Sequence, residues 1–201
     1  MQEDLIPESE KGGSTNTVHD VTEETEAKAN QVFNKAVHRL LNIDHWSDFA
    51  GLGSSVFKLT DEHGDEVNRE PKVEDHMKIN LPGPDSHAGG GFDWVRIEAI
   101  ADKRNPNALA ESFSMRARPC ANPKSKDDKS IAHFFKEDAT STFIIKREGK
   151  KVSAEVRGRN EIPNTSTHDT VDKLRNTFVA IPAILGLSNG QWKKLVFGFL
   201  D

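Results

Sequence analysis

Apolar residues recur along the chain with two different spacings, which separate helical segments from strand segments. Between residues 22 and 41 they recur at steps of three and four, the spacing of an amphipathic helix. From residue 54 to about residue 159 they recur mainly at every second position, the spacing of strands with one covered face. Helical spacing returns at residue 170. The predicted order is therefore helices, then a sheet, then a helix.

Two helical segments are predicted before the sheet. The first covers residues 22–41, with Asp20 and Glu23 as a capping box at its start. A short helical turn follows at residues 44–49, and Trp46 is expected to anchor it to the core.

The last thirty residues are the most apolar part of the chain. A long helix is predicted from residue 170, with a kink at Pro182 because proline removes one helical hydrogen bond, and a second helical piece begins near Ser188. One face of the long helix carries an apolar stripe: Val171, Leu174, Phe178, Ile181 and Leu185. This stripe needs a cover, and a sheet is the expected one.

The middle of the chain is predicted to form about six antiparallel strands. They are expected at residues 55–60, 76–81, 92–101, 111–118, 140–147 and 151–159. Turn-forming residues bound each of them, and the strongest hairpin signal is Glu148-Gly149-Lys150, which makes the last two strands neighbours.

Length and composition favour one domain. Residues 1–18 are polar, acidic and rich in Gly, Ser and Thr, a composition that buries little apolar surface, so we expect a disordered lead-in. The remaining residues, 19–201, are expected to form one domain, because 201 residues with 35% hydrophobic content suffice for a single core.

Charge and cysteine content exclude several classes of protein. A net charge of -5 argues against binding to nucleic acid. The single cysteine, Cys120, excludes an intrachain disulfide and indicates a reducing, cytoplasmic location. The N-terminal residues lack the pattern of a secretory signal. The longest apolar run, residues 178–187, is about half the roughly twenty residues needed to cross a bilayer, so we expect a soluble protein without a membrane span.

The order of elements resembles that of the START-like superfamily, the polyketide cyclase and lipid-transfer relatives. The resemblance is topological and covers about residues 20–200; it depends on the turn Asp44-His45-Trp46-Ser47-Asp48-Phe49 and on the amphipathic helix from Val171. It implies an α+β helix-grip fold, in which a curved antiparallel sheet wraps a long C-terminal helix and leaves a cavity between them. The family opens with a strand, which only residues 15–18 offer here. A cystatin-like or NTF2-like cone is the rival fold.

In a helix-grip domain the cavity would bind a hydrophobic or amphipathic small molecule. Most of the expected ligand contacts are apolar or aromatic residues of the sheet and helices, joined by three arginines. They are Trp46, Trp94, Phe113, Met115, Arg116, Arg118, Phe143, Ile145, Arg157, Phe178, Ile181 and Leu185. No cofactor is expected.

The arginines Arg116, Arg118, Arg157 and Arg159 allow two interpretations. Residues two apart on a strand point the same way, so each pair presents two guanidinium groups that suit an anionic head group. The alternative is a solvated sheet face, with Glu111, Glu155 and Glu161 as cross-strand partners.

Catalysis is left open by the sequence. A cyclase or hydratase using His45, His133 or an arginine in the same cavity is one alternative, and no catalytic residue is identified. Cys120 has basic neighbours but no partner histidine, so an incidental cysteine is favoured.

Two further features complete the candidate chemistry. His76 follows Glu74 and Asp75, but no metal-binding spacing accompanies them, so no metal site is expected. The C-terminal helix, with Phe199 and Leu200 near its end, offers a third functional class: a non-catalytic interaction domain that forms a homodimer.

Overall fold

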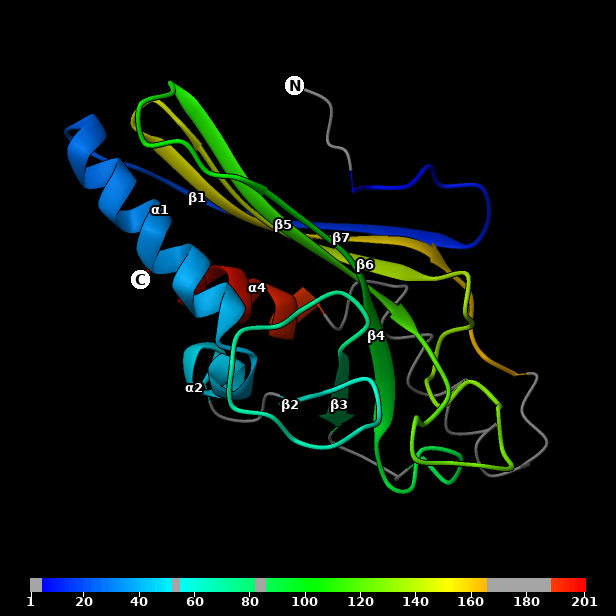
Figure 1. The fold of residues 1–201 in the computed structure, drawn as a ribbon. Helices are drawn as coiled ribbons and strands as arrows, with labels where there is room; N and C mark the ends of the chain where they lie inside the picture. The colour runs from blue at the N-terminus through cyan, green and yellow to red at the C-terminus, as the bar shows by residue number, and fades with distance from the viewer. Residues whose placement is uncertain (1–4, 52–54, 82–85, 166–188) are drawn as a thin grey trace.

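The computed structural model describes residues 5–51, 55–81, 86–165 and 189–201. One curved sheet of seven antiparallel strands carries helices on its concave face (Figure 1). The strands are β1 (Gly13–Thr22), β2 (Val56–Thr60), β3 (His76–Asn80), β4 (Asp93–Lys103), β5 (Ala110–Pro119), β6 (Thr140–Glu148) and β7 (Lys151–Glu161). The helices are α1 (Glu26–Leu41), the 3-10 turn η1 (Ile43–His45), α2 (Trp46–Ala50) and α4 (Asn189–Leu200).

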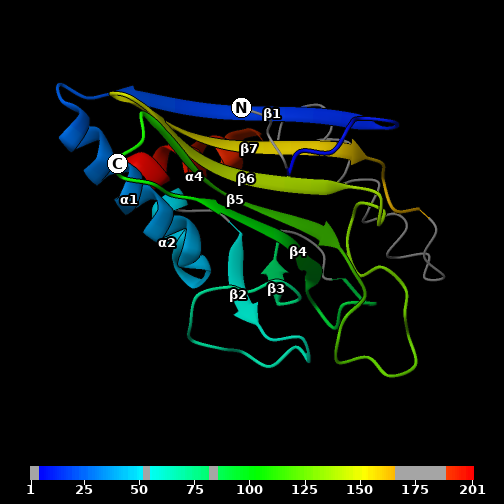
Figure 2. The same ribbon diagram turned by 45° about the horizontal axis from the view of Figure 1, so that its top comes forward.

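The sheet order is β1-β7-β6-β5-β4-β3-β2, as Figure 2 shows. The predicted hairpin is confirmed, because Glu148 pairs with Lys151 and leaves a two-residue turn. Gly149 has a positive φ of 58°, which glycine adopts without steric cost. Alternate residues of β5 are buried on the helix side of the sheet, as the alternation of apolar and polar positions predicts.

The sheet has one strand more than the sequence predicted. β1 begins at Gly13, so residues 13–18 of the expected disordered lead-in are a strand. Few of its side chains are apolar, and its order comes from backbone pairing along β7, for example Thr17 opposite Val156. This strand supplies the opening element that a helix-grip domain requires.

Helix α1 starts four residues later than predicted. Its N-cap is Thr25, whose hydroxyl accepts a hydrogen bond from the Lys28 amide at 3.2 Å. The predicted capping box was wrong, because Asp20 lies in β1 opposite Ser153. The helix buries an apolar face against the sheet, including Phe33, Ala36, Val37 and Leu40.

Trp46 contacts aromatic residues of three elements in the core. Its ring centroid lies 4.8 Å from that of Phe143 on β6, 5.1 Å from Phe57 on β2 and 5.8 Å from Phe199 on α4. Its indole N–H donates to the Leu40 carbonyl at 3.0 Å, so the buried polar atom is satisfied. The predicted anchoring role of Trp46 is confirmed.

A buried ion pair fixes the other end of the sheet. Arg147 Nε lies 2.7 Å from Glu111 Oε1, and the two side chains are only 3% and 2% exposed. Arg147 also donates to the Ala108 carbonyl at 2.8 Å, and Glu111 accepts from the Asn30 side chain and the Asn105 amide, each at 3.0 Å. The pair therefore ties α1 and the β4–β5 loop to the sheet.

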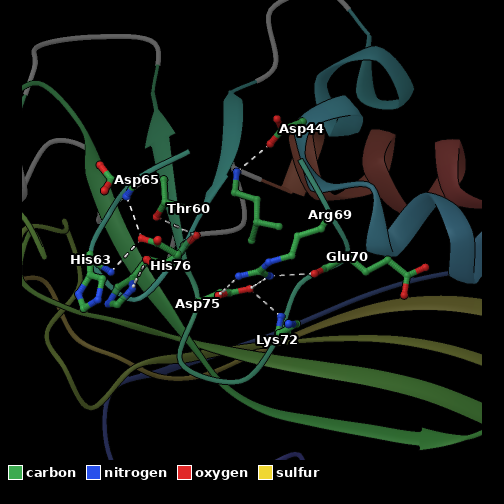
Figure 3. Close-up of polar contacts among 11 residues, drawn as sticks. Asp44, Thr60, His63, Asp65, Arg69, Glu70, Lys72, Asp75 and His76 are labelled. Atoms are coloured by element: carbon green, nitrogen blue, oxygen red, sulfur yellow. Dashed lines mark hydrogen bonds and ion pairs between the residues drawn. The ribbon is translucent and has the colours of Figure 1, made fainter. Parts of the chain in front are cut away.

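The long connection from β2 to β3 is held by polar contacts (Figure 3). The Asp75 carboxylate accepts two hydrogen bonds from the Arg69 guanidinium, at 2.5 and 2.9 Å, and one from the Lys72 amide at 2.7 Å. Asp44 accepts from the Leu59 amide at 2.7 Å and so joins η1 to β2. These contacts give Arg69 and Asp75 a structural role in holding the connection.

Element order, strand order and helix placement are those of a helix-grip α+β domain, which confirms the resemblance in topology. The long helix predicted from residue 170 falls outside the described residues. The helix predicted near Ser188 is α4, which packs against α1, α2, β1 and β7. Among the residues that the structure describes, no helix is long and apolar enough to cross a bilayer.

Candidate ligand-binding site

A cavity of about 200 Å³ lies between one end of the sheet and the first turn of α4. It is formed where β5 and β7 finish and where β4 and β6 begin, together with β2, β3 and the segment that leads into β6. Most of its described lining is apolar, including Phe57, Ile79, Val95, Ala117, Phe143 and Trp192.

Aromatic rings form one wall of the cavity. Trp192 on α4 lies edge-on to Phe143 with centroids 5.6 Å apart, and its centroid is 6.4 Å from that of Phe57. Phe57 and Phe143 lie beside Trp192 because the inward-facing positions of their strands are opposite the first turn of α4. Such a wall suits the apolar body of a small molecule.

Glu161 and Thr140 are polar residues that also line this cavity. Their residues are 6% and 2% exposed, yet Glu161 Oε2 and Thr140 Oγ1 have no hydrogen-bond partner among the described residues. A buried polar atom without a partner has lost its hydration without compensation. Thr140 pairs with Arg159 and precedes the inward Ser141, so its hydroxyl lies on the outer face of the sheet, and the unsatisfied atom on the cavity side is Glu161 Oε2.

A β-bulge turns Glu161 toward the cavity. Gly13 pairs with Glu161 and Thr15 with Gly158, so β7 carries one extra residue between these pairs. Asn160, within the bulge, has a positive φ of 55°, a region that asparagine tolerates better than most residues. The extra residue reverses the alternation of β7 and brings Glu161 to the concave face.

The neighbours of Glu161 fix its carboxyl group. Thr15 Oγ1 donates to Glu161 Oε1 at 3.1 Å. A side chain at Gly158 would place its Cβ 2.1 Å from Glu161 Oε1, so only glycine leaves room for the carboxyl group. Asn160 is held in turn by the N-terminal segment, because its side-chain oxygen accepts from the amides of Glu10 and Lys11 at 2.9 and 3.2 Å.

Burial changes the acidity of this group. Loss of hydration raises the pKa of Glu161 from 4.5 to about 7, while the Thr15 hydrogen bond and the Arg159 charge act in the opposite direction. The carboxyl group can therefore exchange a proton near neutral pH. His133 also lines the cavity, and its Nδ1 accepts from the Phe135 amide at 2.9 Å.

The apolar residues expected as ligand contacts are spread over several places. Phe143 lines the cavity, whereas Trp46, Phe113, Met115 and Ile145 belong to the core beside it. Trp94 is buried elsewhere and donates from its indole to the Gly89 carbonyl at 2.9 Å. The remaining three, Phe178, Ile181 and Leu185, lie outside the described residues.

The arginines lie on the outer face of the sheet. Arg116 and Arg118 form ion pairs with Glu98, and Arg157 Nη2 lies 2.5 Å from Glu155 Oε2. Arg159 donates to the Thr15 and Gly158 carbonyls. The described lining of the cavity contains no arginine, so the position of these side chains favours the solvated-face interpretation.

The acidic partners suggested for these arginines are partly different. Glu155 is one of them, but Glu111 pairs with Arg147 on the inner face and Glu161 points into the cavity. The unforeseen polar arrangement is that of Glu161 with its neighbours Thr15 and Gly158. The signal for this arrangement was a glycine and an asparagine near the end of a strand, which is typical of a bulge.

The remaining candidates show no reactive arrangement. Burial raises the pKa of the Cys120 thiol to about 12, the reverse of what a nucleophile needs. His45 is exposed and its Nδ1 lies 2.8 Å from Asp48 Oδ2. The part of the chain that the structure describes has no group of three or more His, Cys, Asp or Glu side chains placed to hold a metal.

Comparisons with known proteins give only distant similarities. No family model and no curated protein matches this chain. Similar solved structures include ginseng major latex-like protein 151 from Panax ginseng, at 11% identity and a TM-score of 0.36, covering 88% of this chain and 97% of that one. Ara h 8.0201 is 11% identical with a TM-score of 0.38 and covers 94% and 99%. The extracellular domain of PknH from Mycobacterium tuberculosis is 8% identical with a TM-score of 0.36 and covers 88% and 60%. Similarities this weak carry no argument about function, which must come from the site.

Proposed function

We propose that this protein binds a hydrophobic or amphipathic small molecule in the cavity between the sheet and α4. The observation that supports this most is the composition of the cavity: most of its lining is apolar, and Glu161, which lines it, has a buried carboxylate oxygen without a partner among the described residues. Binding sites for small molecules combine these two features, since apolar walls supply affinity and a few polar groups set orientation.

The mechanism is enclosure. Each 100 Å² of apolar ligand surface that leaves water contributes about 2.5 kcal/mol, before the entropy lost on association is subtracted. Pairing Glu161 with a polar group of the ligand would remove the penalty of an unsatisfied buried atom. The free energy of binding therefore has an apolar part and a polar part that separate variants can measure.

A second function, acid–base catalysis of the cyclase or hydratase type, is favoured by one observation. Glu161 faces the cavity with a pKa of about 7, which suits a group that exchanges protons at neutral pH. His133 lines the same cavity and would be the second titratable group. Turnover of a bound ligand that is lost in Glu161→Gln, while binding remains, would support this function.

Binding itself is tested by filling the cavity. Ala117 lines the cavity, and Ala117→Phe places a ring in that space. We expect phenylbutanol, a neutral apolar probe, to bind the wild-type protein in calorimetry and in ligand-observed NMR, and to lose binding in Ala117→Phe. Ser114→Phe is the matched control, since it lies on the same strand at an outward position. Absent binding to the wild type, or retained binding in Ala117→Phe, would refute the proposal.

A further inference from the structure

We propose that the polar end of the cavity recognises a basic amine, so that the ligand is an apolar molecule carrying one amino group. The inference rests on the proposed binding of a small molecule in this cavity and adds the chemistry of the ligand's head group. One atom carries it: Glu161 Oε2, which is buried, has no partner among the described residues and belongs to a residue that lines the cavity.

The available hydrogen-bonding capacity indicates a donor. Glu161 Oε1 already accepts from Thr15, and Oε2 accepts from no donor among the residues that the structure describes. An ammonium group offers three N–H donors and a hydroxyl group offers one, so either can satisfy Oε2, and the charge of the site decides between them.

The charge of the site indicates that the donor is cationic. No ion pair involves Glu161 among the described residues, and the nearby Arg159 directs its guanidinium to the carbonyls of Thr15 and Gly158. An ionised carboxylate at Glu161 would thus be buried without an ion-pair partner. A bound ammonium supplies the missing charge and forms a charge-assisted hydrogen bond, the stronger kind. A carboxylate ligand would meet a like charge.

The carboxyl group is held in place before any ligand arrives. The bulge at Asn160 aims it, the absence of a side chain at Gly158 makes room for it, and Thr15 fixes one of its oxygens. A group whose geometry is set by three separate features loses little conformational freedom on binding. The aromatic wall of Phe143 and Trp192 lies in the same cavity and is available to the apolar body of the ligand.

Three probes of nearly equal size separate the head groups: phenylbutylamine, phenylbutanol and phenylbutyric acid. Their affinities are measured by calorimetry at about pH 8, where the amine is protonated and Glu161 is mostly ionised. The proteins are wild type, Glu161→Gln, which keeps the shape and removes the charge, and Glu155→Gln. The last is the matched control, a buried glutamate of the same strand that faces the other side of the sheet.

We expect the wild type to bind the amine about tenfold more tightly than the alcohol and to bind the acid most weakly. A hydrogen bond to a charged group is stronger than a neutral one by about 1.4 kcal/mol, which corresponds to a tenfold difference in affinity. Glu161→Gln should weaken the amine about tenfold and change the alcohol by less than about twofold. Glu155→Gln should behave as the wild type does.

Other results would overturn the inference. Equal affinities for amine and alcohol in the wild type would show that the head group is not read as a cation. An equal loss of all three probes in Glu161→Gln would show that the residue only supports the cavity. In both cases the wild-type protein still binds the alcohol, so the inference about the amine fails while the proposed binding function survives. A wild type that binds none of the probes would refute the proposed function as well.

Discussion

Replacement of Glu161 by glutamine should stabilise the ligand-free protein at neutral pH. The wild-type carboxyl group is buried and accepts one hydrogen bond from Thr15, and its other oxygen has no partner in the described part of the chain. Burial raises its pKa to about 7, which means that the folded protein holds the proton more tightly than the unfolded chain does. Glutamine has a similar shape and no charge to bury.

The sign and size of the effect follow from this pKa. Below pH 4.5 the carboxyl group is protonated in both states, so ionisation contributes nothing to the free energy of unfolding. As the pH rises from 4.5 to about 7, the unfolded chain releases its proton while the folded protein keeps it, so the wild type loses stability. Above that range the difference stays constant. Each tenfold change in the ionisation constant corresponds to about 1.4 kcal/mol, so the total loss is about 3 kcal/mol.

Urea unfolding followed by tryptophan fluorescence measures this difference. The free energy of unfolding of Glu161→Gln minus that of the wild type should rise by about 3 kcal/mol between roughly pH 4 and pH 8. Glu155→Gln is the control for removal of a buried carboxylate that has an ion-pair partner, and it should not show this rise. A difference that stays flat with pH, or that falls, would refute the account of Glu161 as a buried group without compensation.

Further substitutions test the site and the frame around it. Gly158→Ala puts a Cβ 2.1 Å from Glu161 Oε1, so the carboxyl group must move and calorimetry should show amine affinity falling to that of Glu161→Gln; unchanged affinity would contradict the role of Gly158. Arg147→Met leaves Glu111 buried and unpaired and should cost about 3–5 kcal/mol in urea unfolding, and Glu111→Leu added to it should restore most of the loss. If Glu111→Leu does not restore stability, the cost of Arg147→Met does not come from the unpaired Glu111 carboxylate. Arg118→Gln alters the outer face of the sheet and should leave phenylbutylamine affinity within about twofold, and a larger loss would place this arginine near the ligand.

The regular part of the sheet was predictable from the sequence because its signals are local. Strands β6 and β7 were expected at residues 140–147 and 151–159 and extend over Thr140–Glu148 and Lys151–Glu161. Alternation and a glycine-containing turn specify such a hairpin without knowledge of the rest of the chain. β1 was missed because its order depends on pairing with a strand more than a hundred residues later, which its own polar composition does not reveal.

The site was less predictable than the sheet, because it depends on an irregularity. The inward positions Val152, Ala154 and Val156 imply that residue 161 points outward, and the bulge reverses this. Of the expected contacts that the structure describes, Phe143 alone lines the cavity, since alternation identifies the inward face but not which part of that face is left uncovered by the helices.

Several expectations from the sequence stay predictions. They are the cytoplasmic location, the absence of nucleic-acid binding, the absence of a cofactor, and the possible homodimer through the C-terminal helix. The dimer has one structural feature to test, since Phe197 on α4 is half-exposed and stacks on His19 of β1 with ring centroids 3.8 Å apart. Phe197→Glu should abolish concentration-dependent association in sedimentation if that surface forms the interface.

The most direct test of ligand binding at Glu161 is a crystal structure of the protein with phenylbutylamine. The account predicts that the probe occupies the cavity with its nitrogen about 2.7–3.1 Å from Glu161 Oε2 and its ring against Phe143 and Trp192. A cavity that is filled by the protein's own side chains, or a probe whose nitrogen points away from Glu161, would contradict it.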